Sequence, residues 1–435
     1  MRQRLLREGA NELSYEIRGI VKKAEQLEAL GYSILWENIG DPIQKNHKLP
    51  EWMKDIISGL LYEDGTYGYS HSKGVLETRE FLAELNNQRG GTQINAQDIT
   101  FFNGLGDAIQ KIYQYLLPTS RVIGPSPAYS THSSAEAAHA NHTPITYKLD
   151  PDNSWYPDLV DLENKVKFNP SIVGILIINP DNPTGMVYPK DILEEMVRIA
   201  RDYNLFLICD EIYMNIVYNG ADTCTIAEVI GDVPAISLKG ISKEFPWPGA
   251  RCGWAEYYNR SSDAEFTRLC ETIDNAKMIE VSSTKLPQVS IPRIMQDPRY
   301  ADFIETTKRK IEKRSAYLYE VFKDVPYVKF NQTNGAFYNT MIFEPGVLNE
   351  QQELKIGDEN VRLLLDQWLD DDTMTLDKRF VYYLLAAKNV CIVPISSFAS
   401  DLLGFRITLL EENDEIIKET FERIKEGVME FCQSA

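Results

Sequence analysis

The sequence predicts an α/β protein with two domains, the larger built on a mostly parallel sheet covered by helices. Short apolar runs follow one another between residues 99 and 258, and amphipathic stretches of helical spacing separate several of them. Such alternation is typical of a parallel sheet, because each parallel connection needs a crossover that covers one face. After residue 297 the pattern changes to a long charged helix followed by further strands and helices. We therefore expect a smaller α+β domain after the large one.

The elements from the start of the chain to residue 258 can be assigned in order. A helix is expected over 14–30, where apolar residues recur at helical spacing and Gly31 provides a stop. A second amphipathic helix is expected over 190–204. The seven predicted strands are ITFFN (99–103), RVIGP (121–125), ITYKL (145–149), IVGILIIN (172–179), LFLICDE (205–211), AISLKG (235–240) and CGWAEYY (252–258).

The smaller domain begins with a charged helix over about 297–322 and ends with an amphipathic helix over 413–431. Residues 345–380, rich in Glu, Asp and Leu, are expected to form a mostly helical insertion. The predicted strands of this domain are VKFNQ (328–332), GAFYNTMIF (335–343), VCIVP (390–394) and FRITLL (405–410).

Composition excludes several classes of protein. The formal net charge of -19 repels a phosphate backbone, and no basic patch is evident, so nucleic acid is not an expected partner. No apolar run approaches the roughly 18 residues of a membrane helix, and no signal peptide is evident, so we expect a cytoplasmic protein without membrane contact. The six cysteines form no CxxC or Cys/His group, which argues against a metal site.

Polar and glycine-rich segments follow the predicted strands, where ligands of open α/β sheets bind. NGLGDAIQ (103–110) is a glycine-rich turn that opens a helix, and the free amide groups there favour an anion such as phosphate. NPDNPTG (179–185), DEIY (210–213) and the pair Ser242-Lys243 follow later strands. A lone lysine is usually a solvated surface residue, so the significance of Lys243 depends on its companions.

In this order, the motifs NPxNPTG and SK-x5-G-x-R resemble those of the class I/II aminotransferases of fold type I. The resemblance runs over nearly the whole chain. It implies a large domain over 49–305, built on a seven-stranded sheet, and a small domain formed by both chain ends, 1–48 and 306–435. It also implies pyridoxal 5'-phosphate as cofactor and a homodimer with shared active sites.

The resemblance assigns cofactor contacts residue by residue. It implies that Lys243 binds the cofactor as a Schiff base and later shuttles a proton, and that Asp210 pairs with the pyridine nitrogen. Asn182 and Tyr213 would hydrogen-bond the phenolic oxygen, and Arg251 would bind the phosphate. The remaining implied contacts are Leu105, Gly106 and Ser242 at the phosphate, Tyr129 stacked on the ring, and Tyr69 from the second subunit.

The chain ends supply the implied substrate contacts. ENIGDP (37–42) resembles the turn that closes over the substrate, with Gly40 at the matched position, and Asn182 would also face the substrate. Arg406 matches the arginine that clamps the α-carboxylate, a task suited to a planar donor fork. A lone arginine on an apolar strand is otherwise unusual, because a buried charge without a partner is costly.

Three positions depart from the family pattern. Gly240 stands where a hydroxyl residue is common, and Leu105 stands where a small residue is usual. The segment ISSFAS (395–400) lacks two glycines of the family pattern, so it does not predict how the small domain closes. We therefore expect the phosphate to depend on backbone amides, Ser242 and Arg251.

The predicted function is amino transfer between an amino acid and a 2-oxo acid by a ping-pong mechanism. A carbon-sulfur lyase or decarboxylase that uses the same cofactor is the main alternative, and a non-catalytic regulator is less favoured because no DNA-binding module is evident. A nicotinamide-dependent dehydrogenase is disfavoured because NGLGDA fails the GxGxxG spacing. The sequence does not identify the substrate, since it places no second cation for an acidic side chain.

Overall fold

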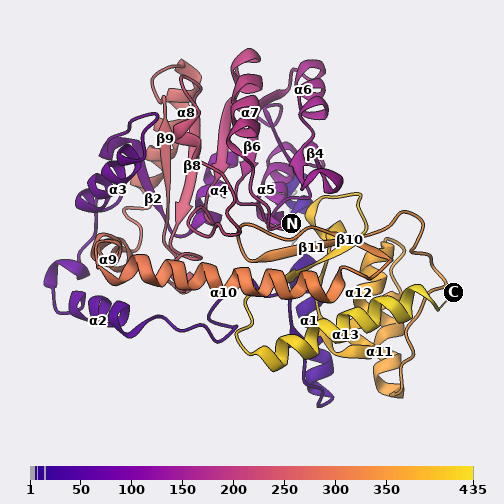
Figure 1. Ribbon diagram of the computed structural model, residues 1–435. Coiled ribbons are helices and arrows are strands. Elements are labelled where there is room, and N and C mark those ends of the chain that lie inside the picture. The colour runs from indigo at the N-terminus through magenta and orange to yellow at the C-terminus, as the bar shows by residue number, and fades with distance from the viewer. Residues whose placement is uncertain (1–4, 7, 14–15, 435) are drawn as a thin grey trace.

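The structure is a computed structural model that describes residues 5–6, 8–13 and 16–434. One part contains a large sheet with helices packed on it, and the other contains a small antiparallel sheet surrounded by helices (Figure 1). The long helix α10 (Arg299–Phe322) runs from beside the large sheet into the smaller part (Figure 1). This arrangement confirms the two-domain α/β fold that the sequence predicts.

The large sheet has the strand order β2-β9-β8-β7-β6-β3-β4-β5. The neighbours from β8 to β4 in this order are parallel, whereas β9 and β5 pair antiparallel. All seven predicted strands are present, and β5 joins them as a two-residue edge strand. The bounds are β2 (Ile99–Phe102), β3 (Arg121–Ser126), β4 (Thr146–Asp150), β5 (Tyr156–Pro157), β6 (Ile172–Ile178), β7 (Phe206–Asp210), β8 (Ala235–Gly240) and β9 (Gly253–Tyr258).

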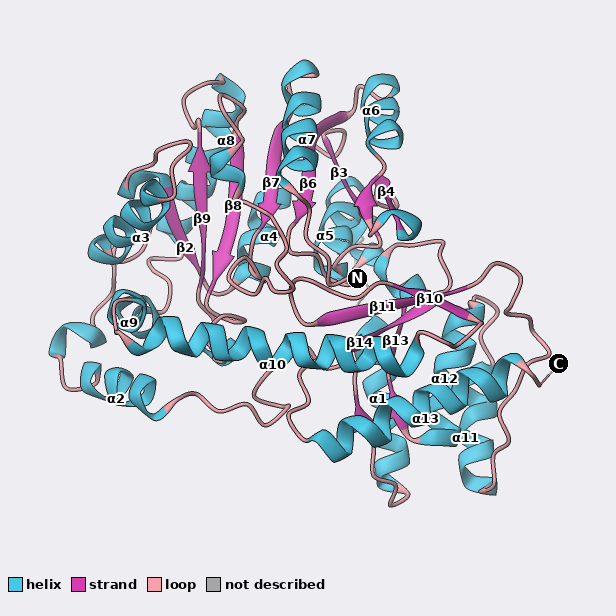
Figure 2. Cartoon of the chain, in the orientation of Figure 1, coloured by secondary structure: helices cyan, strands magenta, loops and turns pink. Residues whose placement is uncertain are grey.

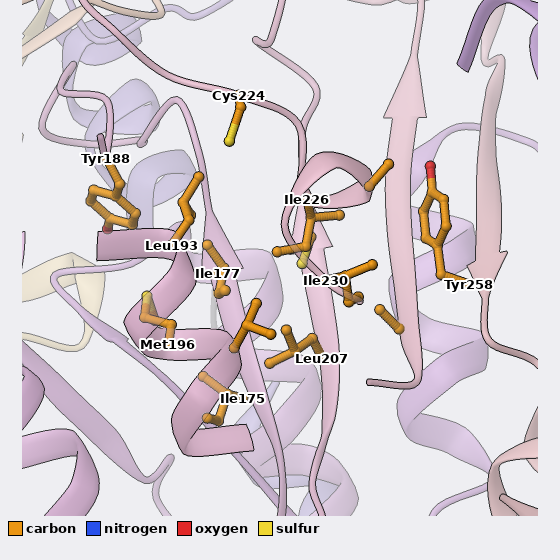
Figure 3. Close-up of a cluster of buried hydrophobic side chains, with 14 of the residues drawn as sticks. Ile175, Ile177, Tyr188, Leu193, Met196, Leu207, Cys224, Ile226, Ile230 and Tyr258 are labelled. Atoms are coloured by element: carbon orange, nitrogen blue, oxygen red, sulfur yellow. The ribbon is translucent and has the colours of Figure 1, made fainter. Parts of the chain in front are cut away.

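Both faces of the central strands are buried, which explains their continuous apolar sequence. Ile175 of β6 packs in one cluster with Leu193 and Met196 of α7 (Lys190–Asp202) (Figure 3). The next residue, Leu176, points to the opposite face and shares a second cluster with Ile112. Side chains alternate between faces along a strand, so a sheet covered on both sides needs apolar residues at successive positions.

The smaller part has an antiparallel sheet of order β10-β11-β14-β13. A separate parallel pair joins β1 to β12, with Leu35 opposite Val390 and Trp36 opposite Cys391. The two chain ends therefore meet in this part of the molecule. The bounds are β1 (Leu35–Trp36), β10 (Val328–Phe330), β11 (Tyr338–Phe343), β12 (Val390–Cys391), β13 (Val393–Pro394) and β14 (Gly404–Thr408).

The expectation that 345–380 is mostly helical is wrong for its first part. Helices occur at α11 (Glu359–Leu369) and α12 (Leu376–Lys388), whereas residues 344–358 contain none. Gly346 has a φ of +80°, which a helix does not accommodate. The buried Gln352 side chain accepts from Asn349 N at 2.9 Å and donates to the Val347 carbonyl at 2.9 Å. These bonds stabilise a turn in place of a helix.

The other predicted helices are confirmed within a few residues, except that positions 14 and 15 lie outside the described residues. Helices lie on both sides of the large sheet and surround the small one (Figure 2). In the described part of the chain, no helix is both long enough and apolar enough to cross a bilayer. The helices not yet given are α1 (Glu16–Ala29), α2 (Glu51–Leu60), α3 (Leu76–Gln88), α4 (Leu105–Gln114), α5 (Ser130–Ala140), α6 (Leu159–Phe168), α8 (Ala264–Ile279), α9 (Lys285–Met295) and α13 (Asp414–Cys432).

Candidate active site

A cavity of 1260 Å³ lies where the carboxyl ends of the central strands face the smaller part of the molecule. Its wall combines residues that follow β2, β6, β7 and β8 with residues from both chain ends. Tyr69 is the predicted site residue that does not line it, and this side chain is 83% exposed. The predicted residues that line the cavity are Gly40, Leu105, Gly106, Tyr129, Asn182, Asp210, Tyr213, Ser242, Lys243, Arg251 and Arg406.

Lys243 lies in the loop after β8, with its amine at the cavity wall. Its Nζ donates a hydrogen bond to the Gly40 carbonyl oxygen at 2.7 Å. A Cβ atom at Gly40 would stand 2.2 Å from the Tyr338 hydroxyl, so this close approach requires glycine. The N-terminal segment is thereby held against the lysine.

Asp210 is the last residue of β7, and its carboxylate is buried. Oδ2 lies 3.0 Å from His132 Nε2, and Oδ1 accepts from the Ile212 amide at 3.2 Å. His132 belongs to α5 and was not predicted, although it follows the predicted Tyr129 by three residues. Two donors orient the carboxylate, which suits it to accept a bond from a protonated ring nitrogen in the cavity.

The start of α4 and the Arg251 side chain form one anion-binding corner. Leu105 and Gly106 are the first residues of α4, so their amide groups have no hydrogen-bond acceptor within the helix. Gly104 precedes them with a φ of +87°, and a Cβ there would stand 2.5 Å from Arg251 Nη2. Free amides, the helix dipole and a guanidinium together favour a dianion such as phosphate, and Ser242 lines the same cavity.

Tyr213 and Tyr338 both line the cavity, and their hydroxyl groups share a hydrogen bond of 3.0 Å. Burial raises the pKa of the Tyr213 hydroxyl well above its ordinary value, and the neighbouring Tyr338 raises it further. Tyr213 therefore keeps its proton at neutral pH and can donate a hydrogen bond to an anionic oxygen.

Arg406, on β14, is 3% exposed and links the two chain ends to the large sheet. Its Nη1 donates to Asn182 Oδ1 at 3.2 Å, and its Nη2 donates to the Asn38 carbonyl at 2.8 Å. The guanidinium carbon also lies 4.5 Å from the Tyr338 ring centroid. Arg406 Nε and Asn38 Oδ1 are buried without a partner among the described residues. An unpaired buried N–H is costly, so the site suits an entering carboxylate.

Asn38 and Tyr338 are also functional contacts that the sequence reasoning missed. Asn38 lies within the quoted segment 37–42, where only the glycine was assigned a role. Tyr338 stands at the start of β11 in a run interpreted only as a strand. Around one primary amine, the cavity thus combines an anion corner, a buried carboxylate and an arginine that can bind a second anion.

Comparison with known proteins agrees with this geometry. Residues 35–424 match the family described as aminotransferase class I and II. The chain is 54% identical over 434 residues to an uncharacterized aminotransferase of Methanocaldococcus jannaschii, with 100% of both chains covered. It is 31% identical over 337 residues to the glutamate-pyruvate aminotransferase AlaA of Escherichia coli, covering 74% of this chain and 79% of that one.

Among solved structures, the alanine aminotransferase of Pyrococcus furiosus superimposes with a TM-score of 0.85 and 26% identity. The match covers 98% of this chain and 100% of that one. The family match, the relatives and the fold agree with one another. The chain belongs to the class I and II aminotransferases, enzymes that move an amino group between an amino acid and a 2-oxo acid.

Proposed function

We propose that this aminotransferase uses pyridoxal phosphate in the 1260 Å³ cavity and exchanges amino groups between alanine and 2-oxoglutarate. The observation that carries the proposal is the convergence of Lys243, Asp210 and Arg406 on one cavity from three distant stretches of chain. Family members generally depend on this cofactor. The alternative lyase and decarboxylase activities have no observation in their favour here.

The residues of the cavity fit the chemical groups of pyridoxal phosphate. Its phosphate matches the corner between α4 and Arg251, where Gly104 leaves room for the guanidinium. Its ring nitrogen matches the Asp210 carboxylate, which His132 orients at 3.0 Å. Its phenolic oxygen matches the donors of Asn182 and Tyr213, and its carbonyl matches the amine of Lys243. The Tyr129 side chain lines the same cavity and is proposed to stack on the ring.

When bound, pyridoxal phosphate supplies an electron sink that weakens the bonds at the amino acid's α-carbon. Asp210 keeps a proton on the ring nitrogen, which maintains that capacity. Arg406 binds the α-carboxylate through two parallel hydrogen bonds and so orients the α-hydrogen. Lys243 Nζ would accept that proton and later return it, and the Gly40 carbonyl, which lies 2.7 Å from Nζ, would hold the amine in place.

Two observations support alanine and 2-oxoglutarate as the substrate pair. Relatives of this chain are named glutamate-pyruvate aminotransferase and alanine aminotransferase. In addition, Arg18 and Lys22 of α1 line the cavity, together with Glu25 and Glu28 of the same helix, and are the proposed cations for a second carboxylate. A dicarboxylate needs a second cation, and alanine fits the same cavity without one.

We infer a homodimer in which Tyr69 reaches the partner's cavity, because this side chain is exposed and lies outside its own. Residues 49–305 are proposed as the large domain, with 1–48 and 306–435 as the small domain. The pairing of Leu35 with Val390 supports the union of both chain ends in one domain. The cytoplasmic location stays a prediction from the sequence.

The proposed amino transfer can be tested by following a ¹⁵N label from alanine to glutamate. The purified enzyme, supplied with pyridoxal phosphate, ¹⁵N-alanine and 2-oxoglutarate, is expected to form ¹⁵N-glutamate and pyruvate in equal amounts. Lys243→Ala should abolish this transfer, because no other amine is proposed to move the α-proton. Lys190→Ala serves as the control, since that exposed lysine lies on α7. Borohydride treatment should fix the cofactor's mass to the peptide that contains Lys243.

Two results would contradict the proposal. Attachment of the cofactor to a different lysine would remove Lys243 from its assigned role. Continuous release of sulfide, ammonia and pyruvate from cysteine, without a 2-oxo acid and without ¹⁵N transfer from alanine, would show carbon-sulfur elimination in place of transfer. If glutamate forms only from another donor, the assignment of alanine is wrong while the cofactor site stands.

A further inference from the structure

One wall of the cavity is the short segment over residues 38–44. Two of its carbonyl groups bind the cations of the site: Asn38 O accepts from Arg406 Nη2 at 2.8 Å, and Gly40 O accepts from Lys243 Nζ at 2.7 Å. A displacement of this segment would therefore move a hydrogen-bond acceptor of Arg406 and another of Lys243. Its members that line the cavity are Asn38, Ile39, Gly40, Asp41 and Gln44.

A buried ion pair joins the two residues that flank this segment. Lys45 Nζ lies 2.7 Å from Glu37 Oε1, and these two residues flank the segment on either side. Glu37 is 1% exposed and Lys45 is 4% exposed. Removing two charges from water is expensive, and good pairing geometry is needed to offset that cost. The pair therefore ties the two ends of the wall together in a single preferred arrangement.

The pair is also attached to the strand that carries Arg406. Glu37 Oε2 accepts from Thr408 Oγ1 at 3.0 Å, and the Thr408 amide donates to the Glu37 carbonyl at 3.0 Å. Thr408 follows Arg406 by two residues on β14, so both side chains project from the same face of that strand. Lys45 Nζ further lies 3.7 Å from Glu411 Oε2. The Glu37–Lys45 pair thus connects the 38–44 wall to the strand that carries Arg406.

We propose that the Glu37–Lys45 pair is a clasp that positions the 38–44 wall so that Arg406 meets the substrate carboxylate in binding-competent geometry. Neither residue lines the cavity, so both are positioning residues that act through Asn38 and Gly40. The inference rests on the proposed function through the role of Arg406. A buried ion pair alone is weak support for stability, but this pair flanks the segment whose Asn38 and Gly40 carbonyls accept from Arg406 and Lys243, which gives it a specific task.

The test compares Lys45→Met with a matched variant, Arg121→Met. Arg121 Nη2 pairs with Glu136 Oε2 at 2.8 Å, and Arg121 is also buried. It stands at the amino end of β3, however, whereas the cavity lies at the carboxyl ends of the strands. Binding of propionate, a carboxylate without an amino group, is measured by calorimetry on the enzyme loaded with cofactor. Hydrogen exchange of the 38–47 peptide is measured by mass spectrometry.

We expect Lys45→Met to weaken propionate binding about tenfold, the loss that corresponds to about 1.4 kcal/mol. Exchange in the 38–47 peptide should accelerate, and the KM for the amino acid should rise more than kcat falls. Arg121→Met should lower the melting temperature and leave propionate binding and exchange at 38–47 unchanged. Lys45→Arg retains the charge and should restore most of the binding. If Lys45→Met does not fold, Glu37→Gln removes the opposite charge with little change of shape and takes its place.

Unchanged propionate binding in the Lys45 or Glu37 variant would overturn the clasp, as would an equal loss in Arg121→Met. The outcome is separable from the proposed function. If wild-type enzyme transfers nitrogen normally while the variant binds propionate as well as wild type, the clasp is wrong and the function stands. If no transfer occurs but the variant loosens both propionate and the peptide, the clasp stands without the proposed substrates.

Discussion

At the scale of single residues, Asp181 shows how burial changes an ionisable group beside the substrate site. Its Oδ2 accepts bonds from the Thr184 amide at 3.1 Å and the Thr184 hydroxyl at 2.5 Å. Oδ1 is buried without a partner in the described part of the chain. Burial raises the pKa of Asp181 from 3.8 to about 7, although the bonds from Thr184 act in the opposite direction. Near neutral pH, the folded protein therefore holds this carboxyl partly protonated.

Asp181→Asn should make the enzyme's stability less dependent on pH. Between pH 4 and 7 the folded state binds a proton at Asp181 that the unfolded state has lost, so the free energy of unfolding falls as pH rises. This contribution is complete below the unfolded pKa and is lost as pH passes 7; it amounts to at most about 4 kcal/mol. Asparagine still accepts from Thr184 and cannot ionise. Melting temperatures from pH 4 to 9 should show the two proteins similar at pH 4 and the variant increasingly more stable up to pH 8. Parallel curves for the two proteins would contradict the assignment.

At the scale of elements, the start of α4 depends on one glycine. Gly104 caps the helix with a φ of +87°, a conformation that side chains disfavour. Its missing Cβ also leaves room for the Arg251 guanidinium, which would otherwise lie 2.5 Å away. Arg251 itself has a φ of +48°, so the anion corner combines two positions of left-handed backbone. The proposed phosphate site therefore depends on both backbone conformations.

Gly104→Ala should therefore weaken cofactor binding as well as stability. The control is Gly90→Ala, because Gly90 has a φ of +88° with nothing within 4 Å of an added Cβ. Both variants should lose about 1 to 2 kcal/mol of stability from the backbone. Only Gly104→Ala should lower the affinity for pyridoxal phosphate, by about tenfold if about 1.4 kcal/mol of contact is lost. Equilibrium dialysis measures this difference, and equal affinity in both variants would exclude the corner as the phosphate site.

At the scale of the whole molecule, exposed apolar side chains gather on two neighbouring segments. Tyr62 is 88% exposed and Tyr69 is 83% exposed in the segment between α2 and α3. Ile279, the last residue of α8, is 87% exposed and precedes α9. The segments adjoin, because Lys285 donates a hydrogen bond to the Gly65 carbonyl and Arg293 Nη1 pairs with Glu63 Oε1 at 2.7 Å. Exposed apolar side chains on adjoining segments favour burial against another protein surface. A second copy fits best, since the exposed Tyr69 is the predicted site residue missing from its own cavity.

Ile279→Asp should shift the enzyme from dimer to monomer. A charge placed at the centre of an apolar interface loses its hydration without a partner, which opposes association. Leu363→Asp is the control, because Leu363 is a 54% exposed residue of α11, outside both segments. Sedimentation at several concentrations should show dimers for wild type and Leu363→Asp and monomers for Ile279→Asp. Specific activity of Ile279→Asp should then rise with protein concentration. A wild-type monomer with full activity would refute the shared site.

Much of the fold was predictable because the relevant information is local. The seven strands appear in the sequence as continuous apolar runs, since a sheet covered on both faces needs apolar residues at successive positions. Asp210 and Lys243 were recognisable because each follows such a run in a motif of fixed spacing. Residues 345–358 were assigned wrongly, because the side chain that stabilises their turn, Gln352, is an ordinary helix former by composition.

By itself, the sequence determined the strand order along the chain, the family and the residue types gathered at the strand ends. These depend on periodicity and short motifs, which are visible in the sequence without knowledge of the fold. Tertiary structure alone decided that His132 orients Asp210 and that Asn38 accepts from Arg406. It also decided that Glu37 joins Lys45 and Thr408, partners 8 and 371 positions away. Contacts of this kind are set by how separate elements pack, and neither partner carries a local pattern that identifies the other.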